Sequence, residues 1–313
     1  MITQPLGKTG LSVSRLAYGC MRIAGTWDPK EITPAREAAA FASLRAAYEA
    51  GYTLFDHADI YAQTGCESLH GKLLKEEPSL REKAMIATKC GIRFGGDPQP
   101  DSPHRYDFAG EHIVWSCEQS LTRLNTDYVD IYQLHRPDVL MDVDEVAEAF
   151  AKLKEQGKVR YFGVSNFSPS FVDLLQSRLP DPLVVNQIEV SLSHLHPFTD
   201  GTLDQCHKDT ITPLAWSPVG GGWLASDTFD PGSDWDPARA KLHSTISATA
   251  KAHGVSNAEI CFAWLLKHPS RMIPIVGSTD PKRISSAVKA TEIELSREEW
   301  YRLYVAARGE ALP

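Results

Sequence analysis

Four side chains with acid–base chemistry each follow a short apolar run of the sequence: Asp56, Tyr61, Lys89 and His135. A Tyr phenol has a pKa near ~10 in water, and the ammonium group of a neighbouring Lys89 favours the phenolate and lowers that pKa. Asp56 can hold Lys89 charged and in place, and His135 can orient a substrate oxygen by a hydrogen bond. Such a set can protonate the oxyanion that develops when a carbonyl is reduced, with the hydride coming from a cofactor.

Each of these residues also has a simpler interpretation when it is taken alone. Asp is a common turn residue and Tyr a common packing residue, so Asp56 could cap the next segment and Tyr61 could fill a core. A lone Lys at a strand end is often solvated, and a lone His there is often structural. None of the four lies beside a nucleophile that it could activate as a base, which disfavours acyl transfer.

The elements that must position these residues alternate along the chain. Apolar runs predict strands at residues 14–21, 53–55, 84–88, 128–134, 159–164, 183–188, 211–215 and 272–276. Helical patterns or helix caps predict helices at residues 35–50, 67–75, 111–124, 143–155, 202–208, 239–254, 257–267 and 281–290, another beginning at Ser168-Pro169, and a last one opened by Ser296.

Eight such units predict one α/β domain over residues 1–313, a (β/α)8 or TIM barrel with an N-terminal β-hairpin at residues 5–15 and an extra C-terminal helix. No GxGxxG follows the first strand, which disfavours a dinucleotide-binding open sheet. In a barrel the C-terminal ends of the strands meet at one mouth. That mouth would gather the four acid–base residues with further polar or aromatic groups at Ser165, Asn166, Gln187 and Trp216.

Composition excludes several classes of protein. The formal net charge is -8 and no basic patch is present, so a nucleic-acid partner is not expected. No apolar stretch approaches the ~20 residues of a membrane span, and no signal peptide is evident. The six cysteines are scattered without a metal-binding spacing, which predicts reduced, mostly buried thiols, no metal site and a cytoplasmic protein. A monomer is the default expectation.

The chain resembles the aldo-keto reductase family over nearly its whole length. Asp56, Tyr61, Lys89 in IATKCG and His135 in LHRPD match, in order, the catalytic set of that family, and GVSNF (163–167) and VNQIEVS (185–191) are similar to further family motifs. The resemblance implies NAD(P)H-dependent reduction of an aldehyde or ketone to an alcohol. Tyr61 would be the proton donor, Lys89 and Asp56 would lower its pKa, and His135 would position the carbonyl.

The resemblance also implies a set of cofactor-binding positions. Ser165, Asn166 and Gln187 would hold the nicotinamide carboxamide, and Trp216, where the family usually has Tyr, would stack on the nicotinamide. Two cations after the last strand would suit the 2′-phosphate, so NADPH is preferred over NADH. The full expected set is Gly19, Met21, Asp56, Ser165, Asn166, Gln187, Trp216, Ser217, Pro218, Gly220, Gly277, Ser278, Lys282 and Arg283.

The chain departs from the family pattern at two further places. His57 stands where the family has Thr, and the sequence offers no physical reason for it. Ser286-Ala287 replaces a Glu-Asn pair, which puts contacts with the adenine in doubt. The substrate cannot be deduced, although its pocket is expected from the region around Trp27, residues 91–108 and the loop after Trp216, with Trp27 and Trp223 as candidate lining residues.

Two rival hypotheses remain open at this stage. His194 and His196, with Asp59 and His57, could form the metal centre of a barrel hydrolase, although no carboxylate or Lys partners stand at matching strand ends. Alternatively, the protein could be an NADPH-binding regulatory or sensor subunit with slow turnover. The intact Asp56-Tyr61-Lys89-His135 set favours catalysis over the second hypothesis.

Overall fold

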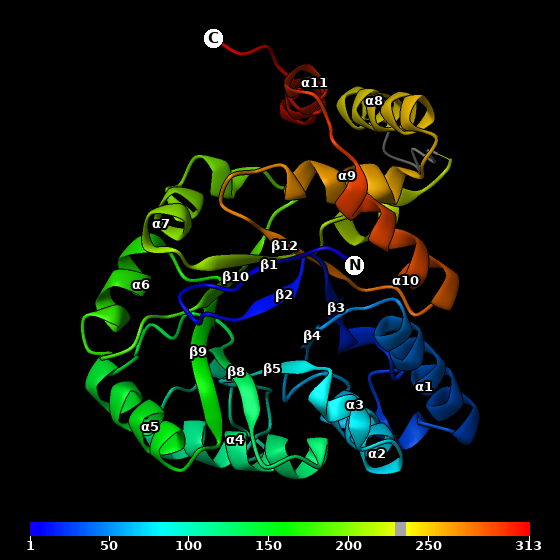
Figure 1. Ribbon diagram of the computed structural model, residues 1–313. Coiled ribbons are helices and arrows are strands. Elements are labelled where there is room, and N and C mark those ends of the chain that lie inside the picture. Colours follow the sequence, from blue (N-terminus) through cyan, green and yellow to red (C-terminus); the bar gives the residue numbers. More distant parts are fainter. Residues whose placement is uncertain (229–235) are drawn as a thin grey trace.

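Eight parallel strands form a closed barrel in the computed structural model, which describes residues 1–228 and 236–313 (Figure 1). The strands are β3 (Ala17–Gly19), β4 (Leu54–Asp56), β5 (Met85–Cys90), β8 (Val129–Leu134), β9 (Val159–Ser165), β10 (Val185–Glu189), β11 (Thr212–Trp216) and β12 (Ile273–Val276). Each strand pairs with the next one along the chain, and β12 pairs with β3 to close the ring. The predicted (β/α)8 fold is therefore confirmed.

Helices surround the barrel, as the apolar runs of the strands require, because both faces of each strand are covered. They are α1 (Pro34–Glu49), α2 (Gly65–Glu76), α4 (Gly110–Leu124), α5 (Val143–Glu155), α6 (Pro169–Gln176), α7 (Thr202–Asp209), α9 (Asn257–Leu266) and α10 (Pro281–Ala287). Local signals fix their ends. Ser168 caps α6, for example, by accepting a hydrogen bond from the backbone N–H of Phe171. Two more helices, α8 (Pro237–His253) and α11 (Arg297–Arg308), lie side by side outside the ring (Figure 1).

An antiparallel hairpin of β1 (Thr3–Pro5) and β2 (Ser12–Ser14) closes one end of the barrel. Its Leu6 and Val13 are fully buried in the same apolar cluster as interior strand residues such as Leu54 and Leu214. The backbone N–H of Gly7 donates to Oγ1 of Thr212, the first residue of β11, at 2.8 Å. The hairpin thus covers the N-terminal ends of the strands, which leaves their C-terminal ends for a functional site.

Several short elements differ from the sequence prediction. The strand expected at 14–21 is shorter, because Ser14 belongs to the hairpin and a 3-10 turn, η1 (Cys20–Arg22), follows β3 directly. The helix expected at 281–290 changes at Val288 into a 3-10 turn, η5 (Val288–Glu292). Helix α3 (Ser79–Glu82), the 3-10 turns η2 (Pro29–Glu31) and η3 (His196–Phe198), and the small hairpin of β6 (Ile92–Arg93) and β7 (Arg105–Tyr106) were not predicted.

The segment after β11 was predicted as a Gly-rich loop and begins with 3-10 turns, η4 (Gly220–Ala225). Part of that predicted loop, residues 229–235, lies outside the described residues. All six cysteines are free and buried, as predicted. Among the residues that the structure describes, no helix combines the length and the apolar character needed to cross a membrane.

Candidate active site

A buried ion pair lies at the C-terminal mouth of the barrel. Asp56 ends β4 and pairs in register with Ala87 of β5, so Lys89, two residues further along, lies on the same face of that strand. Lys89 Nζ is 2.8 Å from Asp56 Oδ1. It also donates to the phenol oxygen of Tyr61 at 3.0 Å and to the backbone carbonyl of His57 at 2.7 Å. These three partners match the three donors of an ammonium group, which makes its burial tolerable.

The pKa of Tyr61 corrects one expectation. Burial raises the pKa of the phenol, the positive charge of Lys89 lowers it, and the negative charge of Asp56 raises it again, with a net value of about 12. Lys89 thus has the predicted effect on the Tyr61 pKa, but the expected lowering is wrong overall, because desolvation outweighs the ammonium group and Asp56 acts in the opposite direction. For Lys89, burial lowers the pKa, but attraction to Asp56 and Tyr61 more than compensates and the pKa is raised. Lys89 is thus charged, and Tyr61 carries its proton, across the physiological range.

His135 lies beside Tyr61 at the same mouth. The two rings meet edge to face, with centroids 5.9 Å apart. Burial, followed by the charges of Lys89 and Arg136, lowers the pKa of His135 well below its usual range, so the imidazole is neutral. Its Nδ1 is buried without a hydrogen-bond partner among the described residues. A neutral imidazole next to a protonated phenol can orient a carbonyl oxygen between two hydrogen-bonding groups.

The residues expected to hold a nicotinamide carboxamide form a second group on neighbouring strands. Gln187 Nε2 donates to Asp56 Oδ2 at 3.1 Å, which joins this group to the ion pair. Asn166 Nδ2 donates to Ser165 Oγ at 2.8 Å, and Trp216 Nε1 donates to Asn166 Oδ1 at 2.9 Å. The side-chain oxygen of Gln187, Oε1, is buried without a partner among the described residues. An unpaired buried acceptor fits the NH2 group of a carboxamide, so these residues suit the cofactor.

Arg136 is a residue of this mouth that the sequence reasoning missed. Its guanidinium carbon lies 5.3 Å from the centroid of the Trp216 ring, a cation–π distance. The signal was present in LHRPD, where Arg136 directly follows His135. It places a fixed positive charge near the aromatic side chain that is expected to contact the nicotinamide.

The segment after β11 turns sharply at residues whose backbone is left-handed. Ser217 and Gly220 have positive φ angles of 51° and 57°. A Cβ atom at Gly220 would lie 2.6 Å from Ser193 Oγ and 2.8 Å from Trp223 Nε1, so only glycine fits there. Pro218 between them is buried. The turn is therefore fixed by its own packing, and its assignment to the pyrophosphate stays a prediction.

The cations expected at the 2′-phosphate lie in a much more open region. β12 ends before Gly277 and Ser278, and the carboxylate of Asp280 caps α10 by accepting from the backbone N–H of Lys282. The Arg283 side chain is 80% exposed, and its Nε lies 3.8 Å from Asp280 Oδ2. Lys282 is exposed as well. These side chains are free to turn toward a ligand.

Gly19 and Met21 lie beside the ion pair. Gly19 is opposite Asp56 in the β3–β4 ladder, and a Cβ atom there would lie 2.7 Å from Ile275 Cγ2. Met21 follows in η1 and is 37% exposed. The structure thus brings both residues to the mouth of the barrel. Ala287, by contrast, is buried in the apolar core, so it offers no contact to an adenine.

The rival metal centre is not assembled. His194 and His196 are on the surface, where each lies near a different carboxylate, Glu189 at 3.9 Å and Asp200 at 2.8 Å. His57 is fully buried elsewhere and exchanges a hydrogen bond with His70. Asp59 instead accepts a hydrogen bond from Ser116 at 2.8 Å. Four side chains with four separate partners do not form the ligand set of a hydrolase.

The predicted substrate-lining regions include exposed aromatic side chains. Trp27 is 57% exposed, and Phe94 and Tyr106 of the β6–β7 hairpin are 43% and 39% exposed. Trp223 stacks under the guanidinium of Arg239, with 4.6 Å from the guanidinium carbon to the ring centroid. Their contact with a substrate stays a prediction.

Comparison with known proteins agrees with this geometry. Residues 15–306 match the model of the Aldo/keto reductase family. The chain is 40% identical over 304 residues to the uncharacterized oxidoreductase YcsN of Bacillus subtilis, covering 97% of each chain. It is 38% identical over 314 residues to a 6-dehydroglucose reductase of Novosphingobium aromaticivorans, covering 98% of this chain and 96% of the relative.

A solved structure is similar as well. The thermostable aldo-keto reductase Tm1743, crystallised with the inhibitor epalrestat, superposes with a TM-score of 0.81 at 30% identity, covering 98% of this chain and all of that one. The chain therefore belongs to the aldo/keto reductase family and is an NAD(P)H-dependent oxidoreductase that acts on small carbonyl compounds.

Proposed function

We propose that the protein reduces an aldehyde or ketone to an alcohol with NADPH, and that Tyr61 donates the proton. The observation that carries this proposal is the buried chain of contacts from Asp56 Oδ1 to Lys89 Nζ at 2.8 Å and from Lys89 Nζ to the Tyr61 hydroxyl at 3.0 Å. Burial of an ammonium group is costly, and a purely structural role would not require it to contact a phenol at the C-terminal mouth of a barrel.

The chain's own residues handle the proton and the orientation of the substrate. The nicotinamide cofactor supplies the hydride when it is bound. Tyr61 holds a proton at its phenol oxygen and donates a hydrogen bond to the carbonyl oxygen of the substrate. The neutral imidazole of His135 forms a hydrogen bond with that same carbonyl oxygen. As negative charge develops on that oxygen, the proton of Tyr61 passes to it, and Lys89 stabilises the phenolate that remains. Asp56 keeps Lys89 charged and in place.

The preference for NADPH rests on the cations after β12. Lys282 and Arg283 are exposed, and the separation of 3.8 Å between Arg283 and Asp280 leaves the guanidinium available for a stronger partner. A 2′-phosphate can accept a bidentate hydrogen-bond pair from Arg, which a ribose hydroxyl cannot do. We therefore assign NADPH as the preferred cofactor.

The proposal is tested by following NADPH absorbance with a panel of aldehydes, ketones and sugars, with NADH alongside. Because one relative is named 6-dehydroglucose reductase, that oxidised sugar belongs in the panel. We expect many turnovers per enzyme molecule with at least one carbonyl compound. Tight NADPH binding without multiple turnovers would contradict the proposal and favour the sensor hypothesis.

We also propose that residues 1–313 act as one domain and as a monomer, because every residue of the candidate site comes from one barrel. Sedimentation equilibrium at the assay concentration should give a mass near 34.6 kDa. A dimer that loses activity on dilution would contradict the monomer.

A further inference from the structure

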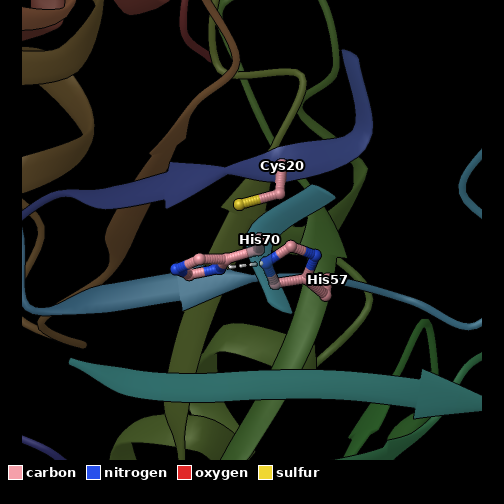
Figure 2. A group of neighbouring side chains, drawn as sticks. All are labelled: Cys20, His57 and His70. Carbon is pink, nitrogen blue, oxygen red and sulfur yellow. Dashed lines mark hydrogen bonds between the residues drawn. The ribbon is translucent and has the colours of Figure 1, made fainter. Parts of the chain in front are cut away.

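Three buried side chains with metal-binding atoms meet directly behind the Asp56–Lys89 ion pair. Cys20 opens η1 after β3, His57 directly follows Asp56, and His70 lies on α2. All three are 0% exposed, and one ligand atom of each lies within 4.8 Å of the others. Figure 2 shows the Cys20 sulfur directed toward the facing nitrogens of the two rings. We refer to these residues as the Cys20–His57–His70 cluster.

The hydrogen bonds of the cluster already prepare one histidine as a ligand. His57 Nε2 and His70 Nδ1 are 2.8 Å apart, and Tyr48 Oη lies 2.9 Å from His70 Nε2. His57 Nδ1 is buried without a partner among the described residues. A buried lone pair without a partner costs less than a buried N–H without one, so His57 donates from Nε2. His70 then offers a lone pair at Nδ1 and donates from Nε2 to Tyr48.

Both rings are neutral, as metal ligation requires. Burial, the repulsion that a protonated His57 would meet from a protonated His70, and the positive charge of Lys89 together lower the pKa of His57 well below its usual range. Burial also lowers the pKa of His70, to about 3. Tyr48, which would accept from the ligating ring, is the kind of outer partner that fixes a metal-bound histidine.

Charge and coordination number select the ion. A thiolate and two neutral imidazoles carry a charge of minus one, so a monovalent cation leaves a neutral buried cluster, whereas a divalent cation leaves an uncompensated positive charge in the core. Zn2+ also prefers four ligands, and the cluster offers three among the described residues. Thiolate and imidazole ligands suit Cu+. We propose that the Cys20–His57–His70 cluster is a binding site for Cu+.

The binding step is balanced without a change of oxidation state. The Cys20 thiol loses its proton to solvent and forms a sulfur–copper bond, while the copper enters and remains as Cu+. His70 donates the lone pair of Nδ1. His57 transfers its proton from Nε2 to Nδ1 and donates the freed lone pair, so the hydrogen bond between the two rings is replaced by two nitrogen–copper bonds.

Copper binding would reach the ion pair through the backbone. Metal–nitrogen bonds of ~2.0 Å at a trigonal angle place the two nitrogens about 3.5 Å apart, farther than the 2.8 Å of the hydrogen bond that they replace. At least one of the two rings must therefore move, and a shift of His57 would reach the ion pair because its backbone carbonyl accepts from Lys89 Nζ at 2.7 Å. The cluster thus provides a route by which Cu+ inhibits the enzyme without occupying the cofactor or substrate site.

The test is a competition for Cu+ between the full-length protein and a colorimetric Cu+ chelator, under nitrogen with ascorbate. The variants are Cys20→Ser, His70→Phe and Tyr48→Phe, with Cys261→Ser as the matched control, because Cys261 is a buried free thiol of a different apolar cluster. Circular dichroism checks the fold of each variant. If Cys20→Ser does not fold, His70→Phe decides.

We expect the wild type and Cys261→Ser to retain about one Cu+ per chain after gel filtration, with Zn2+ not retained. Cys20→Ser and His70→Phe should bind at least ~100-fold more weakly, and Tyr48→Phe about 10-fold more weakly. Equal Cu+ affinity in Cys20→Ser, His70→Phe and the wild type would overturn the site. Equal retention of Zn2+ and Cu+ would overturn the choice of a monovalent ion.

The outcome is independent of the proposed reduction, because metal retention is read without turnover. Tyr61→Phe should retain Cu+ like the wild type. Where the wild type is active, saturating Cu+ should reduce its NADPH consumption at least ~10-fold and leave His70→Phe largely unaffected; equal inhibition of both would overturn the coupling to Lys89.

Discussion

The two ends of the candidate site are built in opposite ways. At the proton-transfer end, Asp56, Lys89 and Tyr61 are at most 8% exposed, and each is held by contacts of 2.8–3.0 Å. At the proposed phosphate end, the Arg283 side chain is 80% exposed and its Nε lies 3.8 Å from Asp280 Oδ2. Under the proposed function, the barrel positions the proton-transfer residues in advance, whereas Lys282 and Arg283 would contact the cofactor phosphate only when it binds.

The difference follows from the elements that carry each group. Asp56 and Lys89 lie within neighbouring strands of a closed barrel, where register fixes their separation. Lys282 and Arg283 lie in the first turn of a short surface helix. Preorganisation is valuable where charge develops during the reaction, and mobility costs little where the ligand itself carries two or more negative charges.

Replacement of the buried Lys89 should have the largest effect, because it removes the buried ion pair that distinguishes the proton-transfer end. Lys89→Met leaves Asp56 charged and buried without its partner, so the free energy of unfolding should fall by about 3–5 kcal/mol. Carbonyl reduction should fall by roughly 10²- to 10⁴-fold. Urea denaturation and steady-state kinetics measure the two effects.

The matched control is the exposed cation Lys282→Met, which should change the free energy of unfolding by less than about 0.5 kcal/mol. Similar destabilisation in both variants would show that burial does not distinguish the two ends.

The pH dependence of the two reaction directions should also differ. His135 is neutral, and Tyr61, with a pKa of about 12, is protonated, so neither group titrates between about pH 6 and 9. Reduction needs the protonated phenol and should be nearly constant in that window. Oxidation of an alcohol needs the phenolate, whose fraction rises about tenfold per pH unit below the pKa. An oxidation rate that levels off below pH 9 would contradict the assigned pKa.

Removal of a phosphate-end cation should have a smaller and more selective effect. Arg283→Ala should weaken the binding of NADPH roughly 10-fold, which corresponds to about 1.4 kcal/mol, and leave the binding of NADH nearly unchanged. Fluorescence titration with both cofactors measures the difference. Arg178→Ala is the control, since Arg178 is a half-exposed arginine in the turn after α6 that pairs with Asp144 at 2.7 Å. Equal losses for NADPH and NADH would remove the 2′-phosphate assignment.

The sequence predicted the barrel because strand and helix signals alternate over its whole length. Helix α5 was predicted with its observed ends, Val143 and Glu155, from its apolar spacing and from Gly157; in the structure Asp142 caps its start and Gly157 follows its end in a left-handed conformation. The β6–β7 hairpin was missed because each strand has two residues, too few for an alternating pattern.

The site residues at the strand ends could be predicted from the sequence, whereas the contact between His57 and His70 could not. Asp56, Lys89 and His135 follow apolar runs, so their meeting followed from the barrel alone. The partnership of His57 with His70 depends on how α2 packs against β4, which no spacing in the sequence encodes. The pKa of Tyr61 was mispredicted for a related reason, because the cost of burial is set by the three-dimensional surroundings and not by the neighbour that the motif supplies.

The central claim is that the phenol of Tyr61 delivers the proton, and Tyr61→Phe tests it most directly. The variant keeps the ring that faces His135 and removes only the hydroxyl that accepts from Lys89. Tyr161→Phe is the matched control, because its hydroxyl donates to the carbonyl of Thr9 in the N-terminal hairpin.

The measurement is kcat for carbonyl reduction together with the Kd for NADPH in both variants. We predict that Tyr61→Phe loses roughly 10²- to 10⁴-fold in kcat while its Kd for NADPH changes less than about 2-fold, and that Tyr161→Phe keeps both values. Full turnover in Tyr61→Phe would contradict the assignment of the acid.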